Sequence, residues 1–137
     1  MNPSQLFSIC SFIVLPCWLT LLVIPEKKWI KYLVVGVVLF LALIYVSQLP
    51  TFFQQEEGGF GSLEEVMLLF KNKNAVLAGW IHYLAFDLLV GTWIATNAVK
   101  KSISKLLVAP CLLCTFMLGP VGFLLYSILK FVMSNKK

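Results

Sequence analysis

Long runs of apolar residues alternate with short polar connections along this chain. Four runs, residues 6–24, 32–49, 75–99 and 106–133, come close to or exceed the roughly 20 residues that a helix needs to cross a bilayer. Backbone amides in hydrocarbon need internal hydrogen-bond partners, and the runs lack the alternating polar positions of a barrel strand, so each is predicted to be a helix. The pattern therefore predicts an all-α, polytopic membrane protein with four transmembrane helices in a single domain, residues 1–137.

The second connection, residues 50–74, has a pattern of its own. Ser62 is followed three residues later by Glu65, which is the pattern of a capping box at the start of a helix. Apolar side chains follow up to Phe70, so we expect a short interfacial helix over residues 63–70, between the second and third spans. Such a helix is either a structural lid that closes the bundle or a gate for a substrate, and the sequence is compatible with both.

The composition limits the chemistry that this chain can perform. Apolar residues make up 60% and charged residues 12% of it, and the mean hydropathy is +0.91, which excludes a disordered chain or an ordinary soluble enzyme. The sequence has one histidine and no nucleotide-binding glycine loop, zinc-protease motif or haem-attachment motif. Cys111 and Cys114 have the spacing of metal and redox motifs, but cysteines in an apolar helix commonly pack as small hydrophobes. We therefore expect neither a cofactor nor a metal.

The charges in the connections predict how the chain is oriented. Residues 25–31 and 100–105 are rich in lysine, whereas residues 50–74 hold four glutamates and fewer lysines. By the positive-inside rule, the two lysine-rich connections face the cytoplasm, and both termini lie on the opposite side with the acidic connection. Lys136 and Lys137 do not fit the rule, because this arrangement puts them on the side opposite the cytoplasm. The net charge of +5 comes from lysines at helix ends, which predicts contact with membrane lipids and no nucleic-acid partner.

The third run contains the chain's only histidine, His82, and the only carboxyl group near the middle of a predicted span, Asp87. Ionisable groups are costly in hydrocarbon, so they usually face a partner or a cavity. At about 100° per residue the two side chains are about 140° apart, so they either flank a cavity or pair with different helices. One interpretation is a structural pair, in which His82 bonds a carbonyl group and Asp87 bonds Tyr45, Tyr83 or a tryptophan N–H. The other is an acid–base or polar-ligand site.

The fourth run is interrupted at Gly119 and Pro120. Proline lacks the N–H that continues a helix, and the glycines on either side, Gly119 and Gly122, lower the local stability of the helix. We therefore expect a kink at this position. It either improves packing or shapes a ligand cavity opposite His82 and Asp87.

Several of these residues resemble a known family. The sequence Trp-Ile-His-Tyr-Leu-Ala-Phe-Asp-Leu-Leu-Val-Gly at residues 80–91, Pro110, Leu-Gly-Pro-Val-Gly at 118–122, and Leu-Pro-Cys-Trp at 15–18 are similar to the abscisic-acid-deficient-four-like family, also called neoxanthin synthase-like. The resemblance implies a four-helix membrane domain and, for plant plastid members, a part in converting violaxanthin to neoxanthin. We expect no plastid transit peptide in this chain, and its basic residues are all lysines. We therefore expect a bacterial member in the inner (cytoplasmic) membrane, whose substrate does not carry over from the plant proteins.

Together, these observations support one leading hypothesis, a cofactor-free isomerase that acts on a carotenoid or other isoprenoid lipid. Turning an epoxide into an allenic alcohol requires a proton delivered to oxygen and a proton removed from a neighbouring carbon, and His82 and Asp87 fit these catalytic roles in either order. The residues expected to contact the substrate are Trp80, Tyr83, Gly119 and Pro120. The alternative is a non-catalytic membrane protein that binds a lipid or a protein partner, with His82 and Asp87 as a structural polar pair. No oligomeric state is predicted.

Overall fold

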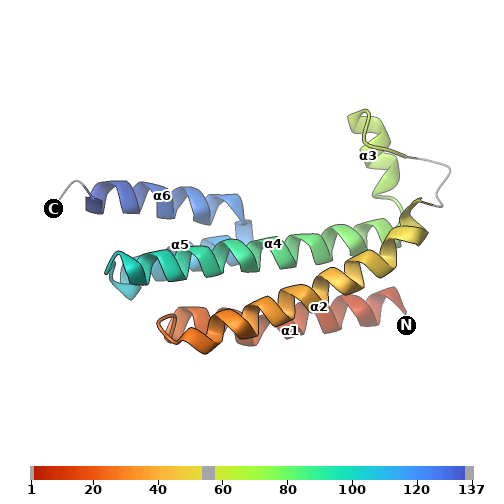
Figure 1. Ribbon diagram of the computed structural model, residues 1–137. Coiled ribbons are helices and arrows are strands. Elements are labelled where there is room, and N and C mark those ends of the chain that lie inside the picture. Colours follow the sequence, from red (N-terminus) through yellow and green to blue (C-terminus); the bar gives the residue numbers. More distant parts are fainter. Residues whose placement is uncertain (1, 54–57, 135–137) are drawn as a thin grey trace.

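The computed structural model describes residues 2–53 and 58–134, and of residues 51–53 it describes the backbone alone. Every regular element in this part of the chain is a helix, which confirms the all-α prediction (Figure 1). The helices are α1 (Pro3–Val23), α2 (Lys28–Phe53), α3 (Leu63–Leu69), α4 (Lys73–Lys100), α5 (Lys105–Leu118) and α6 (Pro120–Ser134).

Three helices, α1, α2 and α4, are long and apolar enough to cross a membrane, which confirms three of the four predicted spans. They lie side by side, and α4 contacts α1, α2, α5 and α6 (Figure 1). Half of the most apolar part of α4 is buried, against 28% for α1 and 17% for α2. Ile81, Leu88 and Ile94 of α4 are fully buried in the core. α4 is therefore the central helix, against which the other helices are positioned.

The fourth predicted span, residues 106–133, is not one continuous helix. The chain reverses at Gly119, whose φ is +46° and ψ is −97°, and α6 runs back along α5 (Figure 1). α5 has 14 residues and α6 has 15, so each is shorter than the roughly 20 residues needed to cross a bilayer. In place of four full-length spans, the structure has three long helices and the α5–α6 hairpin.

Three residues account for this reversal. Gly119 adopts a positive φ that a residue with a Cβ rarely accepts. Pro120 has no N–H to continue α5 and occupies the first position of α6 instead. Gly122 packs so closely on α5 that a Cβ at this position would overlap Thr115 and the carbonyl oxygen of Cys111. The structure has a complete reversal where the sequence predicted a kink. Gly119 permits the turn, and Gly122 permits the close packing of α6 on α5.

The hairpin packs on one half of α4. Tyr126 of α6 is fully buried, donates a hydrogen bond to Oδ1 of Asn97 at 2.8 Å, and contacts Trp93 edge-on at 5.7 Å between ring centroids. At the tip of the hairpin, Gly119 lies against Asp87, which is at the middle of α4. The hairpin therefore covers α4 from its C-terminal end to its middle and leaves the other half of that face uncovered.

The reversal also changes where α6 ends. Lys130, Met133 and Ser134 of α6 line a hollow together with Lys101 and Ile103 of the α4–α5 connection. α6 thus ends beside the lysine-rich connections, whereas α1 begins at the opposite end of the bundle (Figure 1). The end of α6 therefore lies at the other end of the bundle from where a continuous fourth span would end, because α6 folds back along α5. The lysines at 136 and 137 lie outside the described residues.

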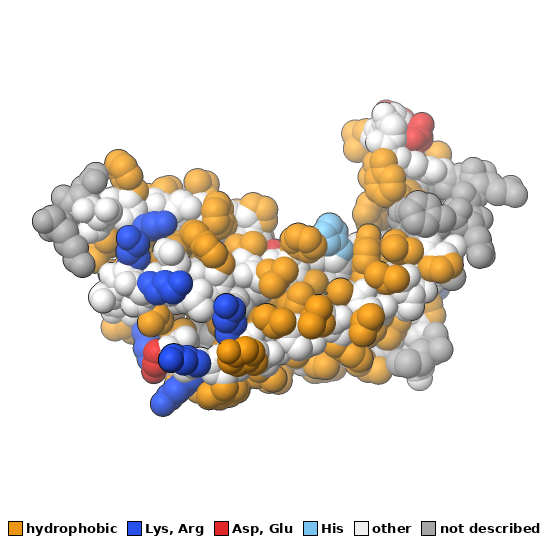
Figure 2. Space-filling view, viewed as in Figure 1, with side chains coloured by type: hydrophobic (Ala, Val, Ile, Leu, Met, Phe, Trp, Pro, Cys, Tyr) orange, Lys and Arg blue, Asp and Glu red, His pale blue; other side chains and the backbone are white. Residues whose placement is uncertain are grey.

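Lysine side chains gather where the α1–α2 and α4–α5 connections meet, a region that we call the lysine end (Figure 2). Lys105 pairs with Oε2 of Glu26 at 2.9 Å and donates a hydrogen bond to the carbonyl oxygen of Val23 at 3.2 Å. The hydrogen bond from Lys105 lowers the pKa of Glu26 below its usual value. These contacts join the start of α5 to the α1–α2 connection.

The short helix expected between the second and third spans is present as α3. Ser62 accepts a hydrogen bond from the backbone N–H of Glu65 at 3.2 Å, as the capping pattern predicts. The Glu65 carboxylate accepts from the N–H of Gly61 at 3.0 Å. α3 projects from the bundle, and the ring of Phe70 at its end lies over Gly79 of α4 (Figure 1). α3 and the hairpin therefore stand on either side of the uncovered half of α4.

The hairpin predicts which positions of the chain lie on the same side of the membrane. We expect Lys101→Cys and Ser134→Cys to react with a membrane-impermeant maleimide from the same side, and Glu64→Cys from the opposite side. All three positions are exposed, and the background for this experiment has its native cysteines replaced. A continuous fourth helix would instead place Ser134 on the side of Glu64, so that labelling pattern would contradict the hairpin.

Candidate functional site

One face of α4 points away from α1 and α2. Ile81 and Leu88 lie on the face that packs in the core, where both are completely buried. Successive side chains are about 100° apart around a helix, so the candidate site residues predicted from the sequence of α4 lie on the face opposite to Ile81 and Leu88. These side chains, with Phe86 beside them, are Trp80, His82, Tyr83 and Asp87.

This face of α4 forms the floor of a hollow in the molecular surface, between α3 and the α5–α6 hairpin (Figure 2). We call it the α4 hollow; it extends along residues 79–87, from Phe70 to the hairpin tip at Gly119. The histidine side chain is visible at its surface in Figure 2. Phe86 remains 58% exposed and Trp80 37% exposed, because the hairpin does not extend past the middle of α4. In a bilayer this hollow would open sideways, towards lipid.

Asp87 is located where α4 meets the hairpin tip. Its Oδ1 is so close to Gly119 that a Cβ there would lie 2.7 Å away. Its Oδ2 is buried and has no hydrogen-bond partner in the described part of the chain. Tyr83, one turn earlier, donates its hydroxyl hydrogen to the carbonyl oxygen of Met117 at 3.0 Å and also interacts with the Asp87 carboxyl group. Both side chains therefore contact the last turn of α5 and the reversal that follows it.

His82 lies on another edge of the same face. Its ring is exposed and contacts Phe86 edge-on at 4.6 Å and Tyr45 of α2 at 5.9 Å between centroids. Tyr45, which the sequence suggested as a partner for Asp87, therefore lies beside His82. The structure thus places His82 and Asp87 on one open face, separated around the helix as the 140° spacing predicts.

Trp80 connects this face to α1. Its indole N–H donates to the hydroxyl of Ser11 at 3.0 Å, and its ring lies 5.1 Å from Phe7 and 5.6 Å from Tyr83 between centroids. Because the N–H already has an acceptor, Trp80 offers a ligand its ring surface. Trp80 and Tyr83 therefore form an aromatic wall that ends at Asp87.

The structure brings together most of the residues predicted from sequence and adds one group that was missed. Tyr83, Asp87, Gly119 and the adjacent Pro120 meet at the hairpin tip, while Trp80 and His82 lie farther along α4. The missed group is the backbone carbonyl of Met117, which accepts from Tyr83. The sequence could have indicated this group. Pro120 marks where α5 must end, and the last four carbonyl groups of a helix, which here include that of Met117, lack an intrahelical partner.

None of the four cysteines is among the side chains described above for the α4 hollow. Cys10, Cys17 and Cys111 are buried, Cys114 is partly buried, and all four are free. Among the described residues, no group of three or more His, Cys, Asp or Glu side chains has an arrangement suited to a metal ion. The side chains of the α4 hollow can donate and accept protons and can stack on an apolar ligand, and these are the functions that their chemistry supports.

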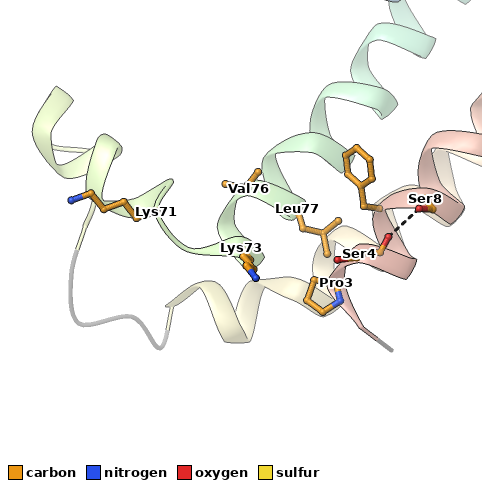
Figure 3. A pocket seen from close by; sticks show the side chains of 8 residues that line it. Pro3, Ser4, Ser8, Lys71, Lys73, Val76 and Leu77 are labelled. Carbon is orange, nitrogen blue, oxygen red and sulfur yellow. Dashed lines mark hydrogen bonds between the residues drawn. The ribbon is translucent and has the colours of Figure 1, made fainter.

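A separate hollow of about 370 Å³ lies at the start of α1 (Figure 3). Ser4 and Ser8 line it from α1, and Ser8 donates a hydrogen bond to the carbonyl oxygen of Ser4 at 3.1 Å. Lys71 and Lys73 line it near the beginning of α4, and Lys71 points away from the serines in Figure 3. It contains none of the titratable residues of the α4 hollow and is not part of the candidate site.

Comparison with known proteins identifies the family. No protein of curated function and no solved structure matches the chain. Residues 5–126 match the ABA DEFICIENT 4-like family, and this range extends from α1 into α6 and includes His82, Asp87 and Gly119. The resemblance seen in the sequence is therefore confirmed over most of the chain. With its long apolar helices, which indicate a membrane protein, this chain belongs to the ABA DEFICIENT 4-like family.

Proposed function

We propose that this protein is a cofactor-free isomerase that uses acid–base chemistry on a carotenoid or other isoprenoid lipid within the membrane. The observation that supports the proposal most is Asp87, a carboxyl group at the middle of the central helix with one buried oxygen that has no partner among the described residues. An unpaired polar group in such a place costs stability, and intramembrane carboxyl groups commonly have a function. Membership of a family whose resemblance implies carotenoid chemistry supports the same class of substrate.

The shape of the α4 hollow suits a long apolar ligand with one polar end. Trp80, Tyr83 and Phe86 provide aromatic surfaces on which a polyene end group can stack. Because the hollow is open on its lipid-facing side, the rest of the chain can remain among the acyl chains of the bilayer. Gly119 and Pro120 would contact the end group at the hairpin tip, next to the Asp87 carboxyl group.

The proposed reaction moves protons only. Asp87, in its neutral form, donates a proton to the epoxide oxygen as the carbon–oxygen bond opens. The imidazole of His82 accepts the proton from the neighbouring polyene carbon, and the electron pair of that C–H bond forms the new double bond of the allene. A proton then returns from His82 to Asp87, so substrate and product have the same composition. The two residues are five positions apart, about 7.5 Å along the helix axis, so they would act from two sides of one end group.

For localisation, we propose a bacterial inner (cytoplasmic) membrane with the lysine end in the cytoplasm. The lysine-rich connections would then follow the positive-inside rule. Ser134 lines a hollow at the same end, so the end of α6 would face the cytoplasm as well. The acidic connection and the first residue of α1 would lie on the opposite side.

The function can be tested with the purified protein in detergent and an epoxide-bearing carotenoid. We expect conversion to an allenic product, measured by chromatography and absorption, and a rate about 10² to 10⁴ lower for His82→Gln, because glutamine cannot accept the proton. The matched control is Thr20→Val, which removes a hydroxyl group that donates to the backbone of α1. Its rate should equal that of the unmodified protein.

The same preparation tests the non-catalytic alternative. Mass spectrometry of the co-purifying lipids should detect a polyene or polyprenoid. If such a lipid is bound but the carotenoid is never converted, and His82→Gln retains the same amount of it, the isomerase proposal is wrong and the lipid-binding alternative is supported.

A further inference from the structure

A pocket of about 400 Å³ lies at the lysine end, away from the α4 hollow. The α1–α2 connection, the first turns of α2 and the last turns of α4 form its walls. Four lysines line it: Lys27, Lys28, Lys31 and Lys100. This concentration of positive charge around one cavity distinguishes it from the hollow in Figure 3, which has two lysines.

The charges of these lysines are largely uncompensated. Glu26 also lines the pocket, but its carboxylate pairs with Lys105 and is therefore already balanced. Lys27 acts on Glu26 only at longer range, and Lys28, Lys31 and Lys100 form no ion pair within residues 2–53 and 58–134. The pocket thus has a net positive charge and space for an anion.

The inner part of the pocket is apolar. Leu21 and Ile30 line it and are buried in the core, and Val99 lines it from α4. The hydroxyl groups of Thr92 and Thr96 also line it, but each donates its hydrogen to a backbone carbonyl of α4. Basic groups at the mouth and apolar walls behind them suit a molecule with an anionic head and an apolar tail.

Two aromatic residues indicate at which level of the bilayer the pocket would lie. Trp29 and Tyr32, in the first turns of α2, are 52% and 77% exposed. Exposed tryptophan and tyrosine at the end of a membrane helix are typical of the headgroup region. Tyr32 itself lines the pocket. The lysines would therefore lie level with phosphate groups of the bilayer.

We propose that this lysine pocket binds the phosphate group of an anionic membrane lipid. The lysines hold the phosphate, and Leu21, Ile30 and Val99 contact the first carbons of the tail. Basic pockets between membrane helices are known to bind anionic headgroups in this way. The site is independent of the proposed isomerase reaction, because it shares no residue with the α4 hollow.

The test is native mass spectrometry of the purified full chain titrated with phosphatidylglycerol, with phosphatidylcholine as the uncharged comparison. We expect one phosphatidylglycerol molecule to be retained in preference to phosphatidylcholine. Lys28→Gln with Lys31→Gln should weaken its binding about 30-fold, at about five- to sixfold for each lysine removed. Both side chains are exposed, so the double variant should remain folded, which its unfolding temperature will show.

The matched control is Lys71→Gln with Lys73→Gln, which removes the same charge at the opposite end of the bundle. It should bind phosphatidylglycerol as the unmodified protein does. Equal loss in both double variants would mean general charge attraction and would overturn the proposal, as would equal retention of the two lipids. A third titration adds inorganic phosphate. If phosphate at the same concentration displaces the lipid, the pocket binds free phosphate and the assignment to a lipid is wrong.

Discussion

Asp87→Asn should lower the rate of carotenoid isomerisation by about 10² to 10⁴ while leaving the protein as stable as before. Asparagine has nearly the same shape and fits beside Gly119, but its amide cannot deliver a proton to an epoxide oxygen. Stability should be retained because Oδ2 of Asp87 has no hydrogen-bond partner in the described part of the chain, and the asparagine side-chain oxygen can keep the interaction with Tyr83. The measurements are the turnover rate and the unfolding temperature in the same detergent.

A second substitution, Asp87→Leu, distinguishes a catalytic role of Asp87 from a structural one more clearly. If Asp87 serves catalysis, leucine should abolish turnover and leave the unfolding temperature close to that of the unmodified protein. Removing the buried Oδ2, which has no partner among the described residues, offsets the loss of the interaction with Tyr83. If Asp87 is instead one member of a structural polar pair, both substitutions should lower the unfolding temperature together. That result would favour the non-catalytic alternative and contradict the role proposed here.

Gly122→Ala should destabilise the protein by about 3 kcal/mol, at the upper end of the usual range for overpacking. The added methyl group would overlap Thr115 and the carbonyl oxygen of Cys111, and this backbone of α5 cannot move aside as a flexible side chain can. Relief requires α6 to separate from α5. We expect the loss in the free energy of unfolding measured by detergent titration.

The control for this substitution is Gly36→Ala in α2. Nothing lies within 4 Å of a Cβ at Gly36, so alanine should be neutral or stabilise the helix by up to about 1 kcal/mol. Equal effects of the two substitutions would show that α6 does not pack on α5 as described. Gly122→Ala should also lower the isomerisation rate, because separating the hairpin helices moves Gly119 relative to Asp87.

The length and composition of the apolar runs were sufficient to predict most of the fold. Spans 6–24, 32–49 and 75–99 correspond to α1, α2 and α4, because a long apolar segment in hydrocarbon has no alternative to internal backbone hydrogen bonding. The position of α3 could be predicted because its start depends on a local contact, between Ser62 and the N–H of Glu65. The 140° separation of His82 and Asp87 likewise follows from helix geometry alone.

The path of residues 106–133 was decided by tertiary structure. A continuous span and a hairpin of two half-length helices have the same apolar composition, so hydropathy cannot distinguish them. The distinction depends on the backbone angles of Gly119 and on the contact between Gly122 and α5, neither of which is visible in a residue pattern. That reversal leaves half of a face of α4 open and brings the last turn of α5 against Tyr83 and Asp87. The sequence thus determined which side chains α4 presents on this face. Only the packing of the hairpin decided which of them are covered, because covering depends on contacts between residues far apart in the chain.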